Sequence, residues 1–312
     1  MDNSNKSSVT ELLLLGFPDV TGSKAVALFI VILIVYVITL MINVMVMVLV
    51  TIKRKLHSPM YFFLQQLSFV ETVFLTLIVP NMLRVIWLEG ATIHLIGCIA
   101  QTYLYCATAC TECQLLTVMA YDRYLAICNP LRYHIIMDMK RQRLLVIYCW
   151  VYSYLLTQIT LNFLCQLDFC GPNVINHFFC DLVPFVGLSC SYKFALQLEI
   201  FIVATPIMVI PFILVIISYI YVFITILGIS SAKGRKKTFS TCSSHLIVVT
   251  MYYGTLISIY MVPPDGYTMN INKLLAFLYI VVTPLFNPII YCLRNQEMKV
   301  VLEKLFDRRN KK

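Results

Sequence analysis

Charged residues are scarce in this chain, and several signatures of catalysis are missing. Asp, Glu, Lys and Arg together make up 12% of the 312 residues, whereas hydrophobic residues make up 60%. A soluble domain carries roughly twice that share of charge, so too few charges remain to cover a soluble surface. The sequence also has no GxSxG elbow, no glycine-rich phosphate loop, no HExxH and no pair of Cys-x-x-Cys motifs. Nothing in it therefore indicates an enzyme.

Long apolar runs are present instead. A bilayer core about 30 Å thick is crossed by roughly 20 apolar residues in a helix, so each run predicts one span. We predict an all-α membrane protein, a seven-transmembrane helix bundle over residues 25–293, preceded by an N-terminal segment (1–24) and followed by a tail (294–312). The predicted spans are 25–52, 60–83, 95–121, 144–164, 196–228, 246–262 and 274–293.

Lysine and arginine are distributed unevenly between the two ends of this bundle. One side holds 19 of the 24 Lys and Arg residues. Cytoplasmic loops retain these residues, so we predict the N-terminus outside and the C-terminus in the cytoplasm. The sequon at Asn5 then lies outside and is a candidate glycosylation site. The net charge of +9 indicates attraction to anionic lipid of the inner leaflet rather than to nucleic acid.

The tail after the last span has apolar residues at helical spacing among Lys and Glu. This pattern predicts a short amphipathic helix on the inner membrane face, with a polar tail that forms no helix as the alternative. The apolar residues are Met298, Val301, Leu302, Leu305 and Phe306.

Cysteines gather on the predicted outer side, where they can stay oxidised. Four of them permit three pairings if all are bridged. Two further cysteines, Cys106 and Cys110, are one helical turn apart, but no histidine matches their depth for a soft metal site. The four outer cysteines are Cys98, Cys170, Cys180 and Cys190.

Two carboxylates fall in the middle of predicted spans, where an ionisable residue is costly and marks function. Glu71 lies eleven residues from Met60, and Glu112 lies eleven residues from Arg123, which places both about 16 Å from the inner ends of their helices. They would repel unless they share a proton or a cation. With oxygens from Asn43 and Asn287, we predict a buried polar cluster that binds sodium. The alternative is a pair of protonated acids that join helices by hydrogen bonds.

Four strings at the inner ends of the helices resemble signatures of the odorant receptors of tetrapod type, which are rhodopsin-like G-protein-coupled receptors. They stand in that family's order, and the resemblance covers residues from about 10 to about 300. Tyr253 stands where other rhodopsin-like receptors usually carry Trp. Departures from the family pattern are Glu71, Asn81 and Asn129, which affect local tuning. The strings are LHSPMYFFL (56–64), MAYDRYLAICNPLRY (119–133), KKTFSTCSSHL (236–246) and PLFNPIIYCLRN (284–295).

The resemblance implies a chemosensory receptor of the plasma membrane that binds a small volatile odorant and activates a stimulatory heterotrimeric G protein. It also implies that Cys98 pairs with Cys180, which leaves Cys170 with Cys190. Arg123 would face the G protein, with Tyr219 and Tyr291 as its partners in the active state. The signalling residues carried over are Asp122, Arg123, Tyr124, Tyr219, Asn287 and Tyr291.

The ligand site is predicted in the outer half of the bundle, between the third, fifth, sixth and seventh helices. Its lining is apolar with a few hydroxyl groups and no charge, which suits a small, weakly polar, uncharged molecule. The predicted lining is Tyr105, Cys106, Ala109, Cys110, Val203, Ala204, Ile207, Leu256, Ile257, Tyr260, Phe277 and Ile280.

Two other functions compete with this interpretation. A non-olfactory rhodopsin-like receptor for a peptide or an amine is disfavoured by Tyr253 and by the uncharged lining. A transporter or channel would place polar residues along a continuous path and break matching helices in the two halves. Here the polar residues cluster at mid-depth and at the inner end.

Overall fold

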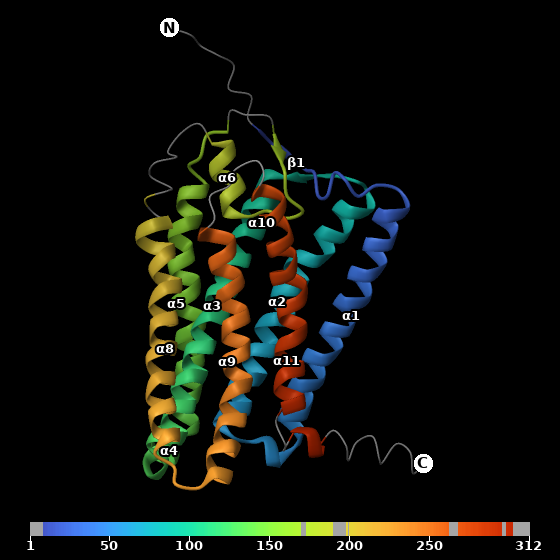
Figure 1. Ribbon diagram of the computed structural model, residues 1–312. Helices are drawn as coiled ribbons and strands as arrows, with labels where there is room; N and C mark the ends of the chain where they lie inside the picture. The colour runs from blue at the N-terminus through green and yellow to red at the C-terminus, as the bar shows by residue number, and fades with distance from the viewer. Residues whose placement is uncertain are drawn as a thin grey trace.

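A computed structural model describes residues 9–169, 173–189, 198, 200–261, 268–294 and 298–301 of the chain. Most of these residues are helical, and the long helices run side by side as a bundle (Figure 1). The helices are α1 (Ser23–Ile52), α2 (Pro59–Trp87), α3 (Leu95–Cys128), α4 (Pro130–Ile136), α5 (Met139–Leu164), α6 (Leu182–Leu188), α8 (Thr205–Leu227), α9 (Ala232–Met261), α10 (Thr268–Phe277) and α11 (Thr283–Arg294).

Six helices within the described residues are long and apolar enough to cross a membrane. They expose isoleucine, leucine and valine on their outer faces, as a lipid-facing helix does. The six segments are Ser23–Ile52, Pro59–Trp87, Met139–Leu164, Phe201–Leu227, Ala232–Ile259 and Ile271–Tyr291.

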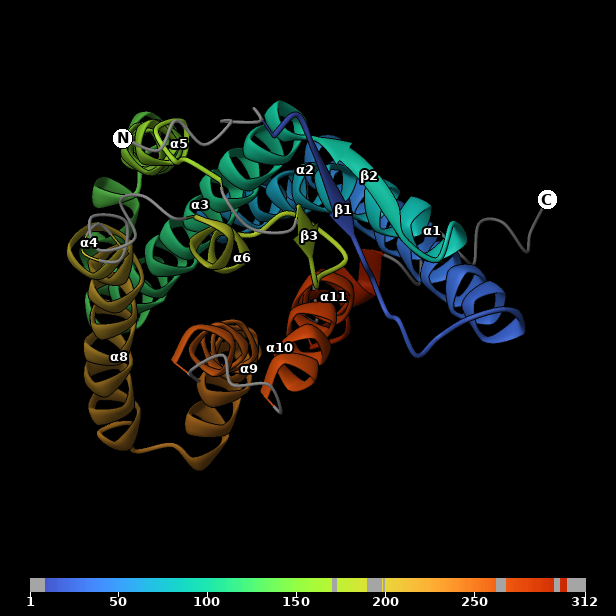
Figure 2. The ribbon, with the colours of Figure 1, turned by 90° about the horizontal axis from the view of Figure 1, so that it is seen from above.

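The remaining long helix, α3, is 34 residues long and lies at the centre of the bundle. Figure 2 shows it running diagonally beneath the others, and it packs against α2, α5 and α8. Buried polar side chains such as Gln101, Thr102 and Gln114 lower its hydropathy. Because they face protein rather than lipid, these side chains are compatible with a central span. The bundle is thus consistent with seven spans.

Two helices are interrupted by π-helical turns near the outer end. Ile200–Ala204 precedes α8, and Leu278–Val282 separates α10 from α11. Such turns are rare in proteins overall, but those that occur often lie at functional sites. Both coincide with the outer zone in which the sequence predicts the ligand site.

A small sheet covers one end of the bundle (Figure 1). Its order is β2-β1-β3, with β1 (Glu11–Leu14) antiparallel to β2 (Ala91–His94) and parallel to β3 (Val174–Ile175). Leu12 and Leu14 are fully buried in β1. The segment before the first helix is therefore part of the fold. We call β1, β2, β3 and residues 173–181 the lid.

The helices contain most of the predicted spans and extend beyond several of them, whereas the fifth predicted span (196–228) runs past both ends of α8 and the sixth (246–262) ends one residue after α9. The difference is largest for α9, which begins at Ala232 rather than at 246, because hydropathy detects the part of a helix within the membrane and not its polar end. Of the predicted amphipathic tail helix, only 298–301 lie among the described residues. These are helical, and Met298 and Val301 are buried.

Candidate functional site

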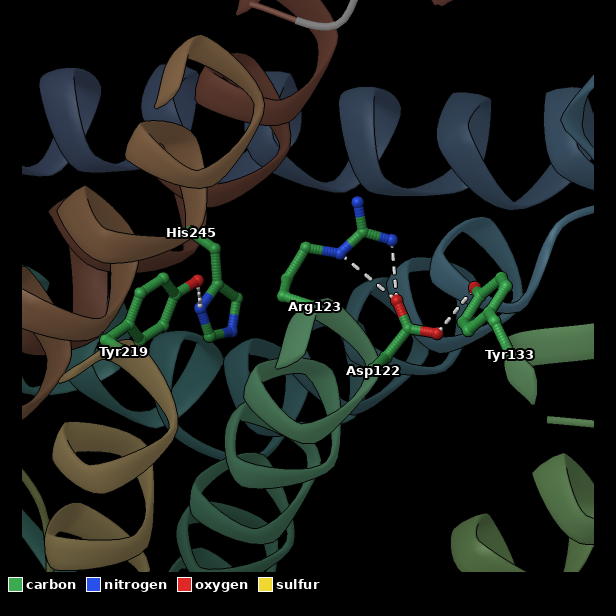
Figure 3. Close-up of polar contacts among 5 residues, drawn as sticks. All are labelled: Asp122, Arg123, Tyr133, Tyr219 and His245. Carbon is green, nitrogen blue, oxygen red and sulfur yellow. Dashed lines mark hydrogen bonds and ion pairs between the residues drawn. The ribbon is translucent and has the colours of Figure 1, made fainter. Parts of the chain in front are cut away.

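A charged pair lies at the end of α3 opposite the lid. The Arg123 guanidinium donates two hydrogen bonds to Asp122 Oδ2, from Nε at 3.1 Å and from the terminal nitrogen at 2.5 Å (Figure 3). Asp122 is fully buried. A buried carboxylate needs such a partner, because an isolated charge is costly to bury. The pair fixes the guanidinium beside α3.

The other oxygen of this carboxylate has a partner from α4. The Tyr133 hydroxyl donates to Asp122 Oδ1 at 2.8 Å (Figure 3). Burial and the neighbouring Asp122 raise the pKa of Tyr133 above its ordinary value, so the phenol stays a donor. Tyr133 therefore connects the short α4 helix to the charged pair.

Tyr219 of α8 is paired with α9 in this structure and not with Arg123. Its hydroxyl lies 2.7 Å from His245 Nδ1, and both side chains are buried (Figure 3). Tyr291 of α11 is also buried, and its hydroxyl has no hydrogen-bond partner among the described residues. Tyr124 packs its ring against Tyr121 and Tyr221. This is an arrangement in which Arg123 is held by Asp122.

The four residues of the predicted buried cluster come together at mid-depth. The Asn287 amide donates to Glu71 at 2.6 Å and to Glu112 at 3.4 Å, and Asn43 donates to the Pro284 carbonyl at 3.4 Å. Within the described part of the chain, the oxygens Asn43 Oδ1, Glu71 Oε2 and Asn287 Oδ1 have no hydrogen-bond partner. Asn287 thus bridges two carboxylates from different helices.

The lid is fastened to α3 by a disulfide. Cys98, in the first turn of α3, is bonded to Cys180, the pairing that the family resemblance implies. Next to it, the Cys180 amide donates to Gln101 Oε1 at 3.0 Å. Cys165, at the same end, is free and exposed. The outer end of α3 and the lid therefore move together.

A buried lysine makes a second attachment of the lid. Lys273 of α10 is 3% exposed, and its Nζ donates to the Gly16 carbonyl at 2.8 Å and to Asn176 Oδ1 at 2.5 Å. Phe17 stacks on Phe178 beside it, with ring centroids 5.2 Å apart. These contacts join three segments that are distant in sequence.

His177 gives the lid a dependence on pH. Burial, and then the charge of Lys273, lower the pKa of His177 from its ordinary 6.5 to about 3. In the open lid His177 binds a proton below pH 6.5, whereas in the closed lid it stays neutral. The free energy that favours closure is therefore fully present above pH 6.5 and is lost as the pH falls toward 3. We expect about tenfold more opening at pH 5.5 than at pH 7.4, or about 1.4 kcal/mol.

Hydrogen exchange of amides 173–181, corrected for intrinsic rates, measures this opening. The control is His177→Phe, which keeps an aromatic ring against Phe178 and Phe179 but removes the titrating group. Equal pH dependence in both proteins would contradict the assignment to His177.

Aromatic rings pack beneath the lid. Tyr105 contacts Phe179 of the lid at 5.2 Å between ring centroids and Phe74 of α2 at 5.6 Å. Deeper, the Tyr252 hydroxyl donates to the Ala109 carbonyl at 2.6 Å. The Tyr253 hydroxyl lies 2.9 Å from Cys113 Sγ. The outer half of the bundle is therefore largely aromatic.

The residues predicted to line the ligand site do not all lie among these aromatic rings. Cys110 lies near Ser153 of α5. Ile257 lies on the exposed side of the bundle, between α8 and α9. Tyr105, Leu256 and Ile280 are buried in the core. Partly exposed positions are Cys106, Ala109, Val203, Ile207 and Phe277. Other predicted site residues lie outside the described part of the chain, namely Asn5, Cys170, Cys190 and the side chains of Ala204 and Tyr260.

Comparison with known proteins identifies the family. The olfactory receptor family model matches residues 32–309. The chain is 43% identical to human olfactory receptor 11L1 over 99% of this chain and 96% of that receptor. It is 42% identical to human olfactory receptor 6B1 (98% and 97% covered), and 40% identical to human olfactory receptor 6P1 (97% and 96% covered). The chain belongs to the olfactory receptor family.

Membership of this family makes the chain an odorant-sensing G-protein-coupled receptor and a multi-pass membrane protein, not an enzyme. In this receptor the charged pair of Asp122 and Arg123 lies at the end of α3 opposite the disulfide-bonded lid.

Two residues of the olfactory receptor's inner end were not selected from the sequence. Tyr133 holds Asp122, and His245 holds Tyr219. Both stand inside strings that carry the resemblance, 119–133 and 236–246, which was the signal for them. Lys273 of α10 and His177 of the lid stand in no comparable motif, and the partners of Lys273 are a backbone carbonyl and a loop side chain.

Proposed function

We propose that this receptor lies in the plasma membrane with seven spans, its N-terminus outside and its tail in the cytoplasm. It binds small, weakly polar, uncharged volatile molecules in its outer half and activates a stimulatory heterotrimeric G protein. The observation that carries the proposal is the arrangement of Arg123, paired with Asp122 at the end of α3 opposite the disulfide-bonded lid. One helix thus connects the lid with the charged pair at the opposite end of the bundle.

The orientation is supported by chemistry at both ends. The disulfide belongs to an oxidising compartment, whereas the Lys and Arg excess belongs to the cytoplasm. Epitope tags at the two termini in unpermeabilised cells test the orientation. Detection of the C-terminal tag alone would overturn it.

The ligand class is supported by the lining beneath the lid. Tyr105 and Tyr252 supply apolar rings with hydroxyl groups, which suits a small molecule that has one weak polar group. Lys273 does not offer a free charge to such a ligand, because it is already bonded to Gly16 and Asn176.

The coupling partner is supported by an apolar face on α4. Leu131 is 95% exposed and Ile135 is 79% exposed, and residues four apart share one face of a helix. Exposed apolar side chains at the cytoplasmic end fit a protein partner. Tyr133, between them, reaches Asp122, so a partner on α4 is connected to the charged pair.

Agonist-dependent nucleotide exchange on a purified stimulatory G protein tests the function. We expect odorants that activate the receptor to accelerate exchange, and Leu131→Ala to reduce that acceleration by about fivefold, or about 1 kcal/mol of lost burial. Leu144→Ala is the control, since Leu144 is exposed on α5. Odorant-gated ion flux without exchange would instead support a channel.

We also propose that the cluster around Glu71 and Glu112 holds a sodium ion. Asn43 Oδ1, Glu71 Oε2 and Asn287 Oδ1 are buried oxygens without hydrogen bonds, and oxygen ligands suit hard cations. These residues would hold the ion, which would offset repulsion between the carboxylates. No group of three or more His, Cys, Asp or Glu in the described part of the chain could hold a metal ion, so the proposed site depends on the amide oxygens of Asn43 and Asn287.

Sodium is expected to oppose activation if it binds the arrangement described here. Replacing choline by sodium should raise the agonist concentration for half-maximal exchange by about fivefold or more. Glu71→Gln and Glu112→Gln should each remove this dependence while the agonist still works in choline. A response that ignores sodium in the unmodified receptor would favour two protonated acids.

A further inference from the structure

An apolar groove lies on the seam between α8 and α9, away from the lid. Its volume is about 570 Å³. The two helices are joined at the cytoplasmic end of the bundle (Figure 1). Aromatic and branched side chains make up its walls, among them Phe212, Ile220, Phe223, Phe239, Val249 and Ile257.

The groove opens toward the membrane. Ile220 is 52% exposed, Phe223 is 53% exposed and Ile257 is 38% exposed. On α9 it runs from Phe239 to Ile257, which is about 27 Å along a helix at 1.5 Å per residue. A single leaflet of the bilayer core is about 15 Å thick. The groove is therefore longer than one leaflet is thick and runs along the helices, with room along it for a flexible chain.

Positive charges surround the cytoplasmic foot of this groove. Arg235 and Lys236 precede Phe239 by one helical turn, and Lys233 lies just before them; all three are exposed. The Arg235 guanidinium donates to the Ile229 carbonyl at 3.0 Å, which holds it at the turn between α8 and α9. A cluster of cations at the inner surface attracts anionic lipid headgroups.

We propose that the groove binds one acyl chain of an anionic phospholipid from the inner leaflet, with its headgroup at Lys233, Arg235 and Lys236. The combination of an apolar channel and cations at its foot selects this ligand over a sterol, whose headgroup is uncharged. The inference goes beyond odorant sensing and relies only on the proposed orientation.

The bound acyl chain contacts two tyrosines that hold helices together. Tyr219 lines the groove, and its hydroxyl pairs with His245. Tyr253 lines the upper end of the groove and lies 2.9 Å from Cys113 of α3. The lipid thus packs against the two tyrosines that join α8, α9 and α3.

Photo-crosslinking of the full receptor in nanodiscs tests the site. The probes are phosphatidylserine and phosphatidylcholine, each with a diazirine in one acyl chain, at equal low density in phosphatidylcholine. We expect the serine probe to label residues 212–226 and 239–257 at least about fivefold more than the choline probe, the gain expected from one cation at the membrane surface. Equal labelling by the two probes would overturn the proposal.

Two pairs of variants localise the signal. Gly254 lines the groove, and a Cβ added there meets nothing within 4 Å, so Gly254→Phe should fill the upper end and displace labelling. Its control is Ile217→Phe, at an exposed position of α8 outside the groove. Lys233→Gln with Lys236→Gln should reduce labelling, whereas Lys140→Gln with Arg143→Gln on α5 should not.

Each variant is first checked for folding by surface expression and monodispersity. The comparison of the two lipid probes on the unmodified receptor stands even if a variant fails this check. The proposal is contradicted if labelling is unchanged in folded Gly254→Phe, or if a sterol fully displaces the serine probe. None of these measurements uses an odorant or a G protein, so failure here is distinct from failure of the proposed function.

Discussion

Replacing Arg123 by alanine is expected to abolish agonist-dependent nucleotide exchange for every odorant that activates the receptor. Arg123 is charged at any accessible pH and is the member of the charged pair that can change partners when the inner ends of the helices separate. Surface expression and odorant affinity in the absence of G protein should change little. The control is Arg132→Ala, since Arg132 is exposed on the neighbouring α4. Full signalling by Arg123→Ala would place the switch elsewhere.

Two further substitutions test the same arrangement at this end of the bundle. Asp122→Asn removes the charge that holds the guanidinium, and His245→Phe removes the partner of Tyr219. Both should raise exchange without agonist, by about fivefold or more, because each weakens the arrangement described here. Lower basal exchange in both would mean that these contacts belong to the active state instead.

Breaking the lid disulfide is expected to have the second large effect. Cys98 and Cys180 are 82 residues apart in sequence, and closing a loop of that length stabilises a fold by about 4 to 5 kcal/mol in the chain-entropy account. Cys98→Ser and Cys180→Ser should therefore each lose most surface expression. The double variant should be no worse than either single variant, because both remove the same bond.

Cys165→Ser is the matched control for this pair. Cys165 is a free, exposed cysteine at the same end of the bundle, so its replacement should leave surface expression unchanged. Surface expression of all four variants can be measured by flow cytometry on an N-terminal tag. Losses that add in the double variant would show that the two cysteines act separately.

The sequence predicts how deep a residue lies in the membrane, but it predicts only in part which way the side chain points around the helix. A constant rise per residue placed Glu71 and Glu112 at one level, and the structure brings both to Asn287. The same spacing selected Cys110 and Ile257 for the ligand site. It did not reveal that Cys110 faces α5 and that Ile257 faces the groove, because helical spacing shows which residues share a face but not which neighbour covers it.

The lid was not predictable from patterns. Its strands are as short as the two residues of β3, and Lys273 is bonded to a backbone carbonyl and a loop side chain. Contacts of this kind depend on how distant loops meet after the bundle has formed, so no periodicity in the sequence reports them. The inner end differs, because its residues stand in motifs that recur together.

The continuity of α3 bears on how a small stimulus is conveyed. This helix carries the disulfide to the lid in its first turn and Arg123 near its last, 25 positions further on, or about 38 Å at 1.5 Å per residue. It contains no proline to bend it. We expect a tilt imposed at the lid end of such a straight helix to displace Arg123 at the other end without a relay of rearranging side chains.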